Sequence, residues 1–275
     1  MAKRYILGGL GIYAGVALTT FSYLRTKQQP KPTSESALKE GATMSVFDSL
    51  AARYDNQISL DERLMGLNLL RWWLVRQAKG SVLEVSAGTG RNLAYYPYHQ
   101  MTTLTLSDAS SPMLEIARDK VVKLTDEKCL ADITLCTARV EDLLQCESSM
   151  CSPDRDCIHP SSVIQPCDVP FKPESYDTVV DTFGLCSHSD PVEALRQMTK
   201  ACKVGGTLLL LEHGRSHWNW LNKVLDESAE RHYYKWGCWW NRDIISLLSQ
   251  AGLKPVSVSR WHFGTTYVIK AIRES

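Results

Sequence analysis

The stretch VLEVSAGTGRN (82–92) has the residue types and spacing of a loop that holds a nucleotide. Gly88 and Gly90 directly follow an apolar run and precede a helical one. Glycine lets the backbone approach a ligand closely, and the start of a helix supplies free N–H groups. Ser86 stands where such loops often have their first glycine. A serine there would cost energy if the backbone required a positive φ.

Two acidic residues and a methionine flank this loop in the sequence. Glu84 lies inside the apolar run before the loop, where burying a carboxylate is costly unless it serves a site. Asp108 ends the next apolar run, from which an acid can accept both hydroxyls of a ribose. Met113 follows at the start of a helix, placed to pack against an adenine ring. The structural alternatives are a salt bridge for Glu84 and a helix cap for Asp108.

Other nucleotide and nucleic-acid sites fit the sequence less well. A dinucleotide fingerprint needs a third glycine, which residues 91–93 do not supply, and no Gly-Lys-Ser/Thr follows to make a P-loop. The net charge of +1 gives no electrostatic footprint for nucleic acid, whose binding depends on neutralising phosphates. A dinucleotide-dependent oxidoreductase is therefore a disfavoured hypothesis.

Alternating strands and helices are expected to position these residues. Strand-like runs cover residues 81–86, 102–107, 131–136, 176–181, 206–212, 254–260 and 265–272. This alternation predicts an α/β domain with a mostly parallel seven-stranded sheet, helices on both faces and a C-terminal antiparallel hairpin. A chain of 275 residues with 44% hydrophobic residues is long enough for one large domain with a full core.

Three polar signals predict where helices begin. Ser59 and Glu62 have the spacing of a capping box ahead of an apolar stretch. Asp190 is followed by a proline, which is typical of a cap and the first helical turn. Asn241 is the expected cap of a helix over residues 242–250.

The first 43 residues differ from the rest of the chain. The run over residues 5–24 is uncharged, and as a helix rising about 1.5 Å per residue it would span a bilayer core of about 30 Å. It predicts a transmembrane helix within a membrane anchor over 1–27, followed by a polar linker over 28–43 and a folded domain over 44–275. A signal peptide is the alternative, but its apolar region is normally about 7–15 residues long.

The charges near the N-terminus indicate which membrane is involved. Residues 1–34 hold five basic and no acidic side chains, the bias of mitochondrial import signals. This favours the mitochondrial inner membrane, crossed once, with the endoplasmic reticulum membrane as the alternative.

Four of the nine cysteines lie in one segment, 146–170, which interrupts the alternation of strands and helices. Their spacing with His159 matches no ordinary zinc module, so no metal site is predicted. We expect a surface insertion before the fourth strand, with metal binding or a disulfide as the alternatives.

Several stretches together resemble the class I S-adenosylmethionine-dependent methyltransferases, whose fold is Rossmann-like. VLEVSAGTGRN, LTLSDASSPMLEIA and ARVEDL look like the first three motifs of that family, and VFDSLAARYDNQ is similar to the opening helix of the ubiquinone and menaquinone C-methyltransferases. DTFGLCS, LLEHGRS and WGCWWNRDI, with the N-terminal run, resemble the Oms-type mitochondrial inner-membrane methyltransferases. Membrane thiol-methyltransferase-like proteins of the endoplasmic reticulum share much of this layout. The resemblance covers roughly residues 44–272.

The resemblance implies that S-adenosyl-L-methionine is the cofactor. The implied cofactor-binding residues come from the N-terminal helix, the glycine loop and the ends of the following strands: Tyr54, Glu84, Ser86, Gly88, Gly90, Asp108, Met113, Glu141, Asp181 and Phe183. Among them, Asp108 would bind the ribose and Glu141 would face the adenine amine. Asp181 and Phe183 would lie where cofactor and acceptor meet.

Methyl transfer from a sulfonium is an in-line displacement, so the protein mainly positions the acceptor and excludes water. His213 is the candidate general base, with a hydrogen bond to the loop backbone as the structural alternative. His188 and Cys186 are weaker candidates. Residues 217–240 hold five of the eight tryptophans, which either pack in the core or form a lid over an apolar acceptor.

The leading hypothesis is a membrane-anchored methyltransferase that acts on a small or lipid-soluble acceptor, such as a quinone precursor, a phospholipid or a thiol. The competing hypothesis is a cofactor-binding mitochondrial assembly or scaffold protein without turnover, because no indispensable catalytic side chain can be named.

Overall fold

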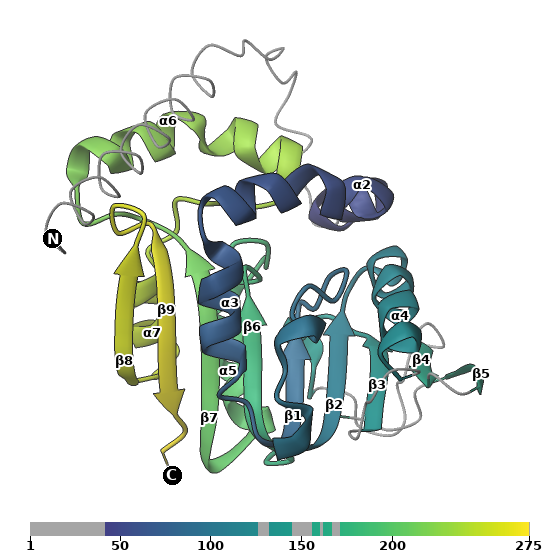
Figure 1. Ribbon diagram of the computed structural model, residues 1–275. Helices are drawn as coiled ribbons and strands as arrows, with labels where there is room; N and C mark the ends of the chain where they lie inside the picture. The colour runs from purple at the N-terminus through teal and green to yellow at the C-terminus, as the bar shows by residue number, and fades with distance from the viewer. Residues whose placement is uncertain (1–41, 126–131, 145–155, 160–161, 167–170, 275) are drawn as a thin grey trace, which may run out of the picture. The chain divides into compact units, whose positions relative to one another are not determined.

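One mixed sheet organises the residues that the computed structural model describes, which are 42–125, 132–144, 156–159, 162–166 and 171–274. Its nine strands lie in the order β5-β4-β3-β2-β1-β6-β7-β9-β8 (Figure 1). The strands are β1 Gly80–Val85, β2 Met101–Asp108, β3 Asp132–Thr137, β4 Asp156–His159, β5 Ser162–Pro166, β6 Tyr176–Thr182, β7 Cys202–His213, β8 Pro255–Trp261 and β9 Thr266–Ile272.

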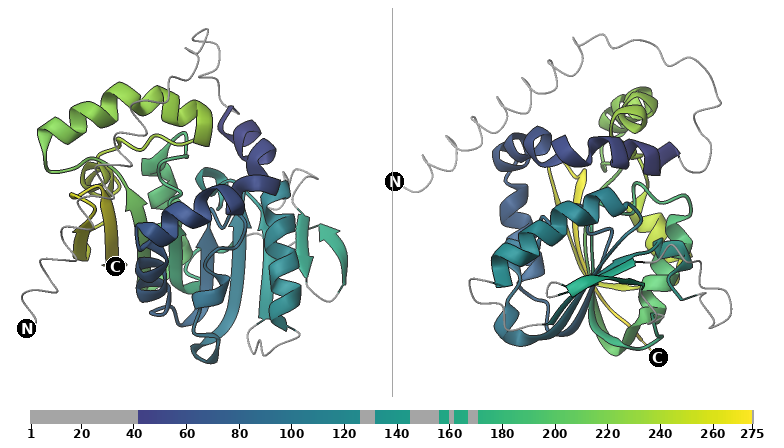
Figure 2. Two further views of the ribbon diagram at one scale, coloured as in Figure 1. Left: turned by 45° about the horizontal axis from the view of Figure 1, so that its top comes forward. Right: turned by 90° about the vertical axis from the view of Figure 1, so that its right-hand side faces the viewer.

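Helices cover both faces of this sheet. They are α2 Ala42–Leu64, α3 Leu67–Val75, α4 Ser111–Thr125, α5 Pro191–Ala201, α6 Asn219–Trp236 and α7 Ile244–Gln250, with a short 3-10 turn η4 at Val140–Asp142. Helices α3 and α4 lie on one face, and α5 and α7 lie on the other (Figure 2). Helices α2 and α6 lie over the carboxyl ends of the parallel strands (Figure 1).

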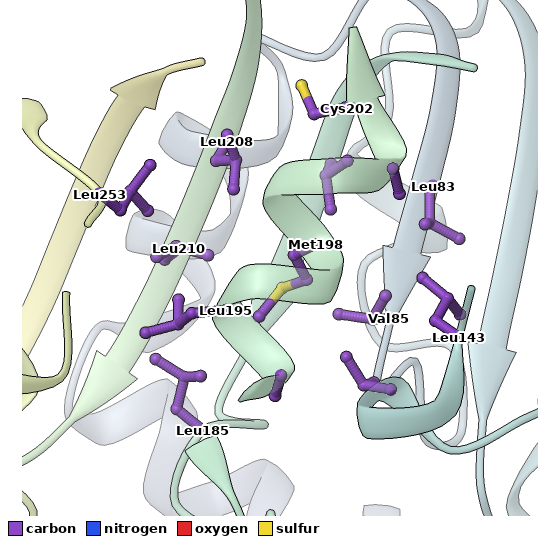
Figure 3. Packing of buried hydrophobic residues seen from close by; sticks show 14 of the residues in the cluster. Leu83, Val85, Leu143, Leu185, Leu195, Met198, Cys202, Leu208, Leu210 and Leu253 are labelled. Carbon is purple, nitrogen blue, oxygen red and sulfur yellow. The ribbon is translucent and has the colours of Figure 1, made fainter. Parts of the chain in front are cut away.

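The parallel strands are apolar because they are buried on both faces. The run 208–211 of β7 consists of four leucines that are all fully buried. On one face, Leu195 and Met198 of α5 pack between the β1 and β7 side chains of Leu83 and Leu210 (Figure 3). These contacts hold the central strands and α5 in one packed core.

The strand register gathers acidic residues at one edge of the sheet. Val85 of β1 pairs with Asp181 of β6, and Asp108 is the last residue of β2. Glu212 lies next to the end of β7. Since the carboxyl ends of parallel strands meet at the same edge, these side chains belong to the region where ligands bind in open α/β sheets.

The predicted sheet is wrong in its strand count and in its balance of directions. Strands β4 and β5 form an antiparallel hairpin that extends the sheet beyond β3, and both come from the 146–170 segment that we expected to be a surface insertion. Together with β8 and β9 they make a mixed sheet rather than a mostly parallel one. Neither strand has the long apolar run by which the central strands were recognised.

The structure of the described residues contains no counterpart of the predicted transmembrane helix. Among the helices of the described residues, none combines the length and the apolar character needed to cross a bilayer. The predicted span 5–24 and the anchor 1–27 lie outside the described residues, as does most of the linker. Helix α2 begins at Ala42, two residues before the expected start of the domain.

The three predicted helix starts have different outcomes. The capping box is wrong, because Ser59 and Glu62 both lie inside α2. The cap at Asp190 is confirmed, since its carboxylate accepts the N–H groups of residues 192 and 193 at 3.1 and 2.9 Å. Helix α7 is capped by Asp243, which accepts the N–H of residue 246 at 3.1 Å, and not by Asn241.

Candidate functional site

The glycine loop follows β1 in a left-handed backbone conformation. Gly88 has a φ of 54° and Gly90 a φ of 71°. A Cβ added to Gly90 would lie 2.6 Å from the Leu93 side chain, so close packing requires this glycine. A Cβ on Gly88 would meet nothing within 4 Å, so this glycine borders open space. The loop thus combines one tightly packed glycine with one that leaves room for a ligand.

Ser86 carries the strain that its position suggested. Its φ is 51°, in the region that non-glycine residues adopt at a cost of roughly 1–2 kcal/mol. The hydroxyl Oγ lies 3.2 Å from His188 Nε2, within hydrogen-bonding distance. The side chain also packs against Gly184, where an added Cβ would lie 2.4 Å from Ser86 Oγ. Ser86 therefore joins the glycine loop to the loop after β6.

Glu84 is buried and is held by neutral partners rather than by a salt bridge. The Tyr96 hydroxyl donates to one carboxyl oxygen at 2.6 Å, and the Asn92 amide donates to the other at 2.9 Å. Burial raises the pKa of Glu84 to about 7, although both hydrogen bonds oppose the increase. Glu84 thus holds the residues that follow the glycine loop through two hydrogen bonds. Its carboxyl group titrates close to neutral pH.

Asp108 joins the glycine loop to the start of α4. Its two oxygens accept the N–H groups of Gly88 and Ser110 at 2.7 and 2.8 Å. Burial raises its pKa, and these two amides oppose the rise. The Ser110 hydroxyl, not Asp108, accepts from the N–H of Met113 at 3.4 Å. A carboxylate has about four acceptor sites, so two bonds to amides leave room for two ribose hydroxyls.

Helix α2 covers this part of the site. Met113 is buried against Leu50 and Ala51, with Tyr54 packed beside them. Tyr54 of α2 and Met113 therefore lie together in one apolar cluster, and their place against an adenine ring stays a prediction.

Glu141 lies apart from that cluster, on η4 and facing the loop after β6. One carboxyl oxygen accepts from the N–H and the hydroxyl of Ser189, each at 3.1 Å, and the other lies 3.7 Å from His188 Nδ1. Burial alone would raise the pKa of Glu141, but His188 and Arg139 lower it below its usual value. The structure thus gives Glu141 a contact with the 187–189 loop.

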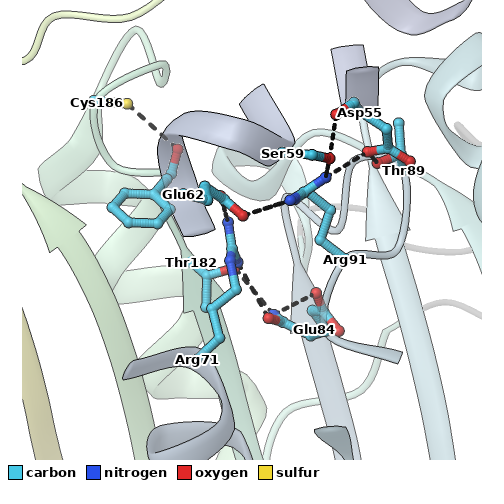
Figure 4. Close-up of polar contacts among 11 residues, drawn as sticks. Asp55, Ser59, Glu62, Arg71, Glu84, Thr89, Arg91, Thr182 and Cys186 are labelled. Carbon is cyan, nitrogen blue, oxygen red and sulfur yellow. Dashed lines mark hydrogen bonds and ion pairs between the residues drawn. The ribbon is translucent and has the colours of Figure 1, made fainter. Parts of the chain in front are cut away.

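A charged network between α2 and the glycine loop was not predicted from the sequence (Figure 4). Glu62 is buried and binds two arginines, Arg71 at 2.8 Å and Arg91 at 2.5 Å. Asp55 accepts from Arg91 at 2.9 Å and from the Thr89 hydroxyl at 2.7 Å. The only signal in the sequence is the spacing of Asp55 and Glu62, which places both on one face of a helix.

Asp181 forms a second buried acidic group with Glu212 of the neighbouring strand. Both side chains are fully buried. Burial raises the pKa of each far above its usual value, and the charge of Asp181 raises that of Glu212 further. Burial and mutual repulsion therefore disfavour the charged form of both groups.

Phe183, His213 and two cysteines form a group near the carboxyl ends of β6 and β7. Phe183 has a φ of 62°, and its ring centroid lies 5.4 Å from that of His213. His213 Nε2 lies 2.8 Å from Cys238 Sγ, and Cys186 is buried nearby. His213 thus contacts a thiol rather than only the loop backbone. Cys238 was not among the predicted residues.

The aromatic segment 217–240 divides between core and surface. Tyr233 is buried and stacks on Trp239 at 4.6 Å between ring centroids. Trp218 and Trp220 are 43% and 55% exposed, and the Trp218 ring lies 6.1 Å from that of Phe263 in the turn between β8 and β9. The core interpretation is therefore confirmed for Tyr233, and the lid over an apolar acceptor stays a prediction.

The arrangement of loop and acid suits S-adenosyl-L-methionine. Gly88 leaves open space where a side chain would otherwise lie, and Asp108 lies 2.7 Å from its N–H. The remaining acceptor sites of Asp108 are available to a ribose, and the open space at Gly88 leaves room for the adjoining part of the cofactor. A dinucleotide site would also have to hold a diphosphate, and the fingerprint of such sites includes a third glycine that this loop lacks.

Known proteins support this assignment. A family model described as a methyltransferase domain matches residues 55–258. The chain is 35% identical over 242 residues to the mitochondrial methyltransferase OMS1 of Saccharomyces cerevisiae, covering 88% of this chain and 48% of the relative. It is 31% identical over 200 residues to the ubiquinone/menaquinone biosynthesis C-methyltransferase UbiE of Francisella philomiragia, covering 69% of this chain and 66% of that protein. The chain thus spans about half the length of the yeast relative.

Solved structures show the same fold at low identity. A SAM-dependent methyltransferase from Thermotoga maritima superposes with a TM-score of 0.54 at 18% identity, covering 84% of this chain and 100% of that one. An O-methyltransferase family protein from Burkholderia thailandensis gives a TM-score of 0.59 at 13% identity, covering 96% of this chain and 70% of that one. The chain therefore belongs to the methyltransferase domain family and has the Rossmann-like class I fold, with S-adenosyl-L-methionine as the methyl donor.

Proposed function

We propose that this protein transfers a methyl group from S-adenosyl-L-methionine to a small or lipid-soluble acceptor in mitochondria. The observation that carries the proposal is the open space beside Gly88 with Asp108 behind it, in a chain of the methyltransferase domain family. The mitochondrial location is supported by the similarity to OMS1 and by the basic, acid-free residues 1–34.

The proposed cofactor orientation follows the strand ends. The amino-acid end lies over Glu84, Ser86 and the two loop glycines, Gly88 and Gly90, and the ribose lies on Asp108. The adenine lies beneath α2 with Met113 and Tyr54, in the apolar cluster formed there. The methyl group then points toward Asp181 and Phe183, on the side where the acceptor enters. Glu141, which accepts a hydrogen bond from the Ser189 N–H, stays the residue predicted to face the adenine amine.

When bound, S-adenosyl-L-methionine supplies a methyl group that is already activated, so the chain itself needs little covalent chemistry. Its residues orient the acceptor for in-line attack and keep water out. Phe183 and the fully buried Asp181 line the point of transfer. His213 is the group proposed to take a proton from an acceptor that must lose one, because its imidazole lies beside Phe183.

The exposed aromatic side chains support a lipid-soluble acceptor. Trp218, Trp220 and Phe263 form a group on the surface near the carboxyl ends of the strands, and each is more than 40% exposed. Tryptophan favours the boundary between water and lipid. The UbiE relative is named for ubiquinone and menaquinone biosynthesis, so an aromatic quinone precursor is the first acceptor to test, followed by phospholipids and thiols.

Turnover with a lipid extract tests this proposal. The full chain is incubated with methyl-labelled S-adenosyl-L-methionine and mitochondrial lipids, and both S-adenosylhomocysteine and labelled products are measured. Gly88→Arg is the inactive variant, because its side chain fills the open space. Gly205→Arg is the matched control, because Gly205 also has a positive φ with nothing within 4 Å but lies at the amino-terminal part of β7.

We expect labelled product with the unchanged chain and with Gly205→Arg, but not with Gly88→Arg. If cofactor binds and no extract yields product, the chain is a cofactor-binding protein without turnover. If Gly88→Arg is as active as the unchanged chain, the proposed site is wrong.

A further inference from the structure

Three side chains that commonly bind metals converge at the acceptor side. Cys186 lies in the loop after β6, His213 at the end of β7 and Cys238 after α6. One nitrogen of His213 and the two sulfurs all lie within 4.8 Å of one another. Both cysteines are buried and reduced. Segments far apart in the sequence therefore bring one ligand each to a single point.

Backbone hydrogen bonds hold these segments together. The Trp239 N–H donates to the Cys186 carbonyl at 2.9 Å, which joins the two cysteine loops directly. The Arg242 guanidinium donates to the carbonyls of Leu185 and His188 at 2.9 and 2.7 Å. The segments that carry the two cysteines are thus held together by hydrogen bonds of their own.

The donor set indicates which ion would fit. Thiolate and imidazole are the ligands that zinc prefers among divalent ions, whereas magnesium and calcium prefer oxygen. Zinc binds sulfur at about 2.3 Å and nitrogen at about 2.0 Å, so ligand atoms around it lie roughly 3.5 Å apart. Modest side-chain movements within the observed 4.8 Å limit would satisfy this geometry.

Two buried carboxyl groups adjoin these ligands: Glu212 directly precedes His213 in β7, and Asp181 lies near the end of the neighbouring strand β6. All four side-chain oxygens of Asp181 and Glu212 are buried and have no hydrogen-bond partner in the described structure. Buried polar groups are normally partnered, and a carboxylate without a partner is costly. A divalent ion on the nearby cysteines would stabilise both carboxylates electrostatically.

We propose that Cys186, His213 and Cys238 bind a zinc ion beside the methyl-transfer site. Three protein ligands leave the fourth tetrahedral position to water or to a heteroatom of the acceptor, as in catalytic rather than structural zinc sites. With its nitrogen on zinc, His213 acts on the acceptor through the ion instead of as a free base. The proposal stands whether or not the cofactor assignment is correct.

Metal content of the full chain tests the proposal. The protein is purified under reducing conditions, treated with zinc, freed of unbound metal and analysed by mass spectrometry for zinc, iron and copper. Cys238→Ser and His213→Gln remove ligands, and Cys202→Ser is the matched control, because Cys202 is also buried and reduced but begins β7. A further variant removes the other candidate thiols by serine substitution at Cys146, Cys151, Cys157 and Cys167.

We expect about one zinc per chain in the unchanged protein, in Cys202→Ser and in the variant of the 146–170 segment, with a loss of most zinc in the two ligand variants. Cobalt added to the metal-free unchanged protein gives a second readout that needs no substitution, because thiolate ligation produces intense charge-transfer absorption. Zinc that survives in Cys238→Ser, or cobalt without thiolate absorption, overturns the proposal. An unchanged protein that retains no zinc after this treatment overturns it too.

Discussion

At the scale of single residues, Ser86 shows how a departure from a motif is accommodated. The backbone keeps the positive φ of 51° that a glycine would adopt freely. The hydroxyl lies within hydrogen-bonding distance of His188, which belongs to the same loop as Cys186. The sequence motif identifies the glycine loop, but only the structure shows that Ser86 links this loop to the loop after β6.

Two substitutions at this position separate strain from hydrogen bonding. Ser86→Gly and Ser86→Ala both remove the hydroxyl, and they differ only in the Cβ that is strained at positive φ. We expect Ser86→Gly to be the more stable variant by about 1 kcal/mol, the strain of a side chain in this region less the entropy of glycine. Chemical denaturation measures the difference, and a Ser86→Ala variant that is the more stable of the two would show that Ser86 is unstrained.

Glu84 predicts a pH dependence of stability. Its pKa of about 7 in the folded chain lies above the usual value of 4.5, so the folded state binds this proton more tightly than the unfolded state. The contribution of Glu84 to the free energy of unfolding is therefore fully present below about pH 4.5. This contribution, about 3 kcal/mol, is lost as pH rises through about 7. Glu84→Gln should become more stable relative to the unchanged chain as pH rises over this window. Unfolding at pH 5 and pH 8 checks the sign, and a constant difference would contradict it.

At the scale of elements, α2 is fastened by buried charges rather than by its apolar side chains alone. Glu62 forms ion pairs with both Arg71 and Arg91. The Glu62 and Arg71 residues are only 5% and 4% exposed. Because α2 covers Met113, this network also fixes the cover over the proposed adenine position.

Removing the charge of Glu62 should therefore be costly. Glu62→Gln leaves two arginines without their shared carboxylate, and we expect a loss of about 3 kcal/mol in the free energy of unfolding. Asp226→Asn is the control, because its ion pair with Arg215 is exposed and should contribute less than about 1 kcal/mol. Denaturant titrations of both variants give the comparison. Losses of equal size would show that the α2 network is no stronger than a surface pair.

The elements differ in how far sequence could predict them. The central strands were predictable because burial on both faces demands apolar runs such as the four leucines of β7. Ser59 and Glu62 have the spacing of a capping box, but their side chains bind within α2 and across to the arginines, so that local pattern predicted a false helix start. Strands β4 and β5 lack an apolar pattern and were missed for that reason.

The same limit applies to the site. The cofactor side could be proposed from sequence because its residues cluster around one loop and the next strand. The convergence of Cys186, His213 and Cys238 could not, since it depends on how three distant segments fold together. The charged network of α2 depends on long-range packing in the same way.

At the scale of the whole molecule, the exposed aromatic side chains Trp218, Trp220 and Phe263 and the proposed site lie at the same end of the sheet (Figure 1). Substituting Trp218 and Trp220 by alanine should raise the KM for a lipid-soluble acceptor in vesicles, while leaving the KM for the methyl donor unchanged. The physical reason is that these rings favour the lipid–water boundary. Val204→Ala is the control, because Val204 is 53% exposed in the amino-terminal part of β7. An unchanged acceptor KM in the double variant would contradict a role for this surface.

The identity of the bound cofactor is the central claim, and calorimetry tests it most directly. S-Adenosylhomocysteine, S-adenosyl-L-methionine and NAD are titrated into the unchanged chain, Asp108→Ala and Asp119→Ala, the last being an exposed acid on α4. We predict binding of the first two ligands and not of NAD. We also predict about 100-fold weaker binding in Asp108→Ala, from the loss of two charge-assisted hydrogen bonds of roughly 1.5 kcal/mol each, and no change in Asp119→Ala. Binding of NAD alone, or undiminished S-adenosylhomocysteine binding in Asp108→Ala, would contradict it.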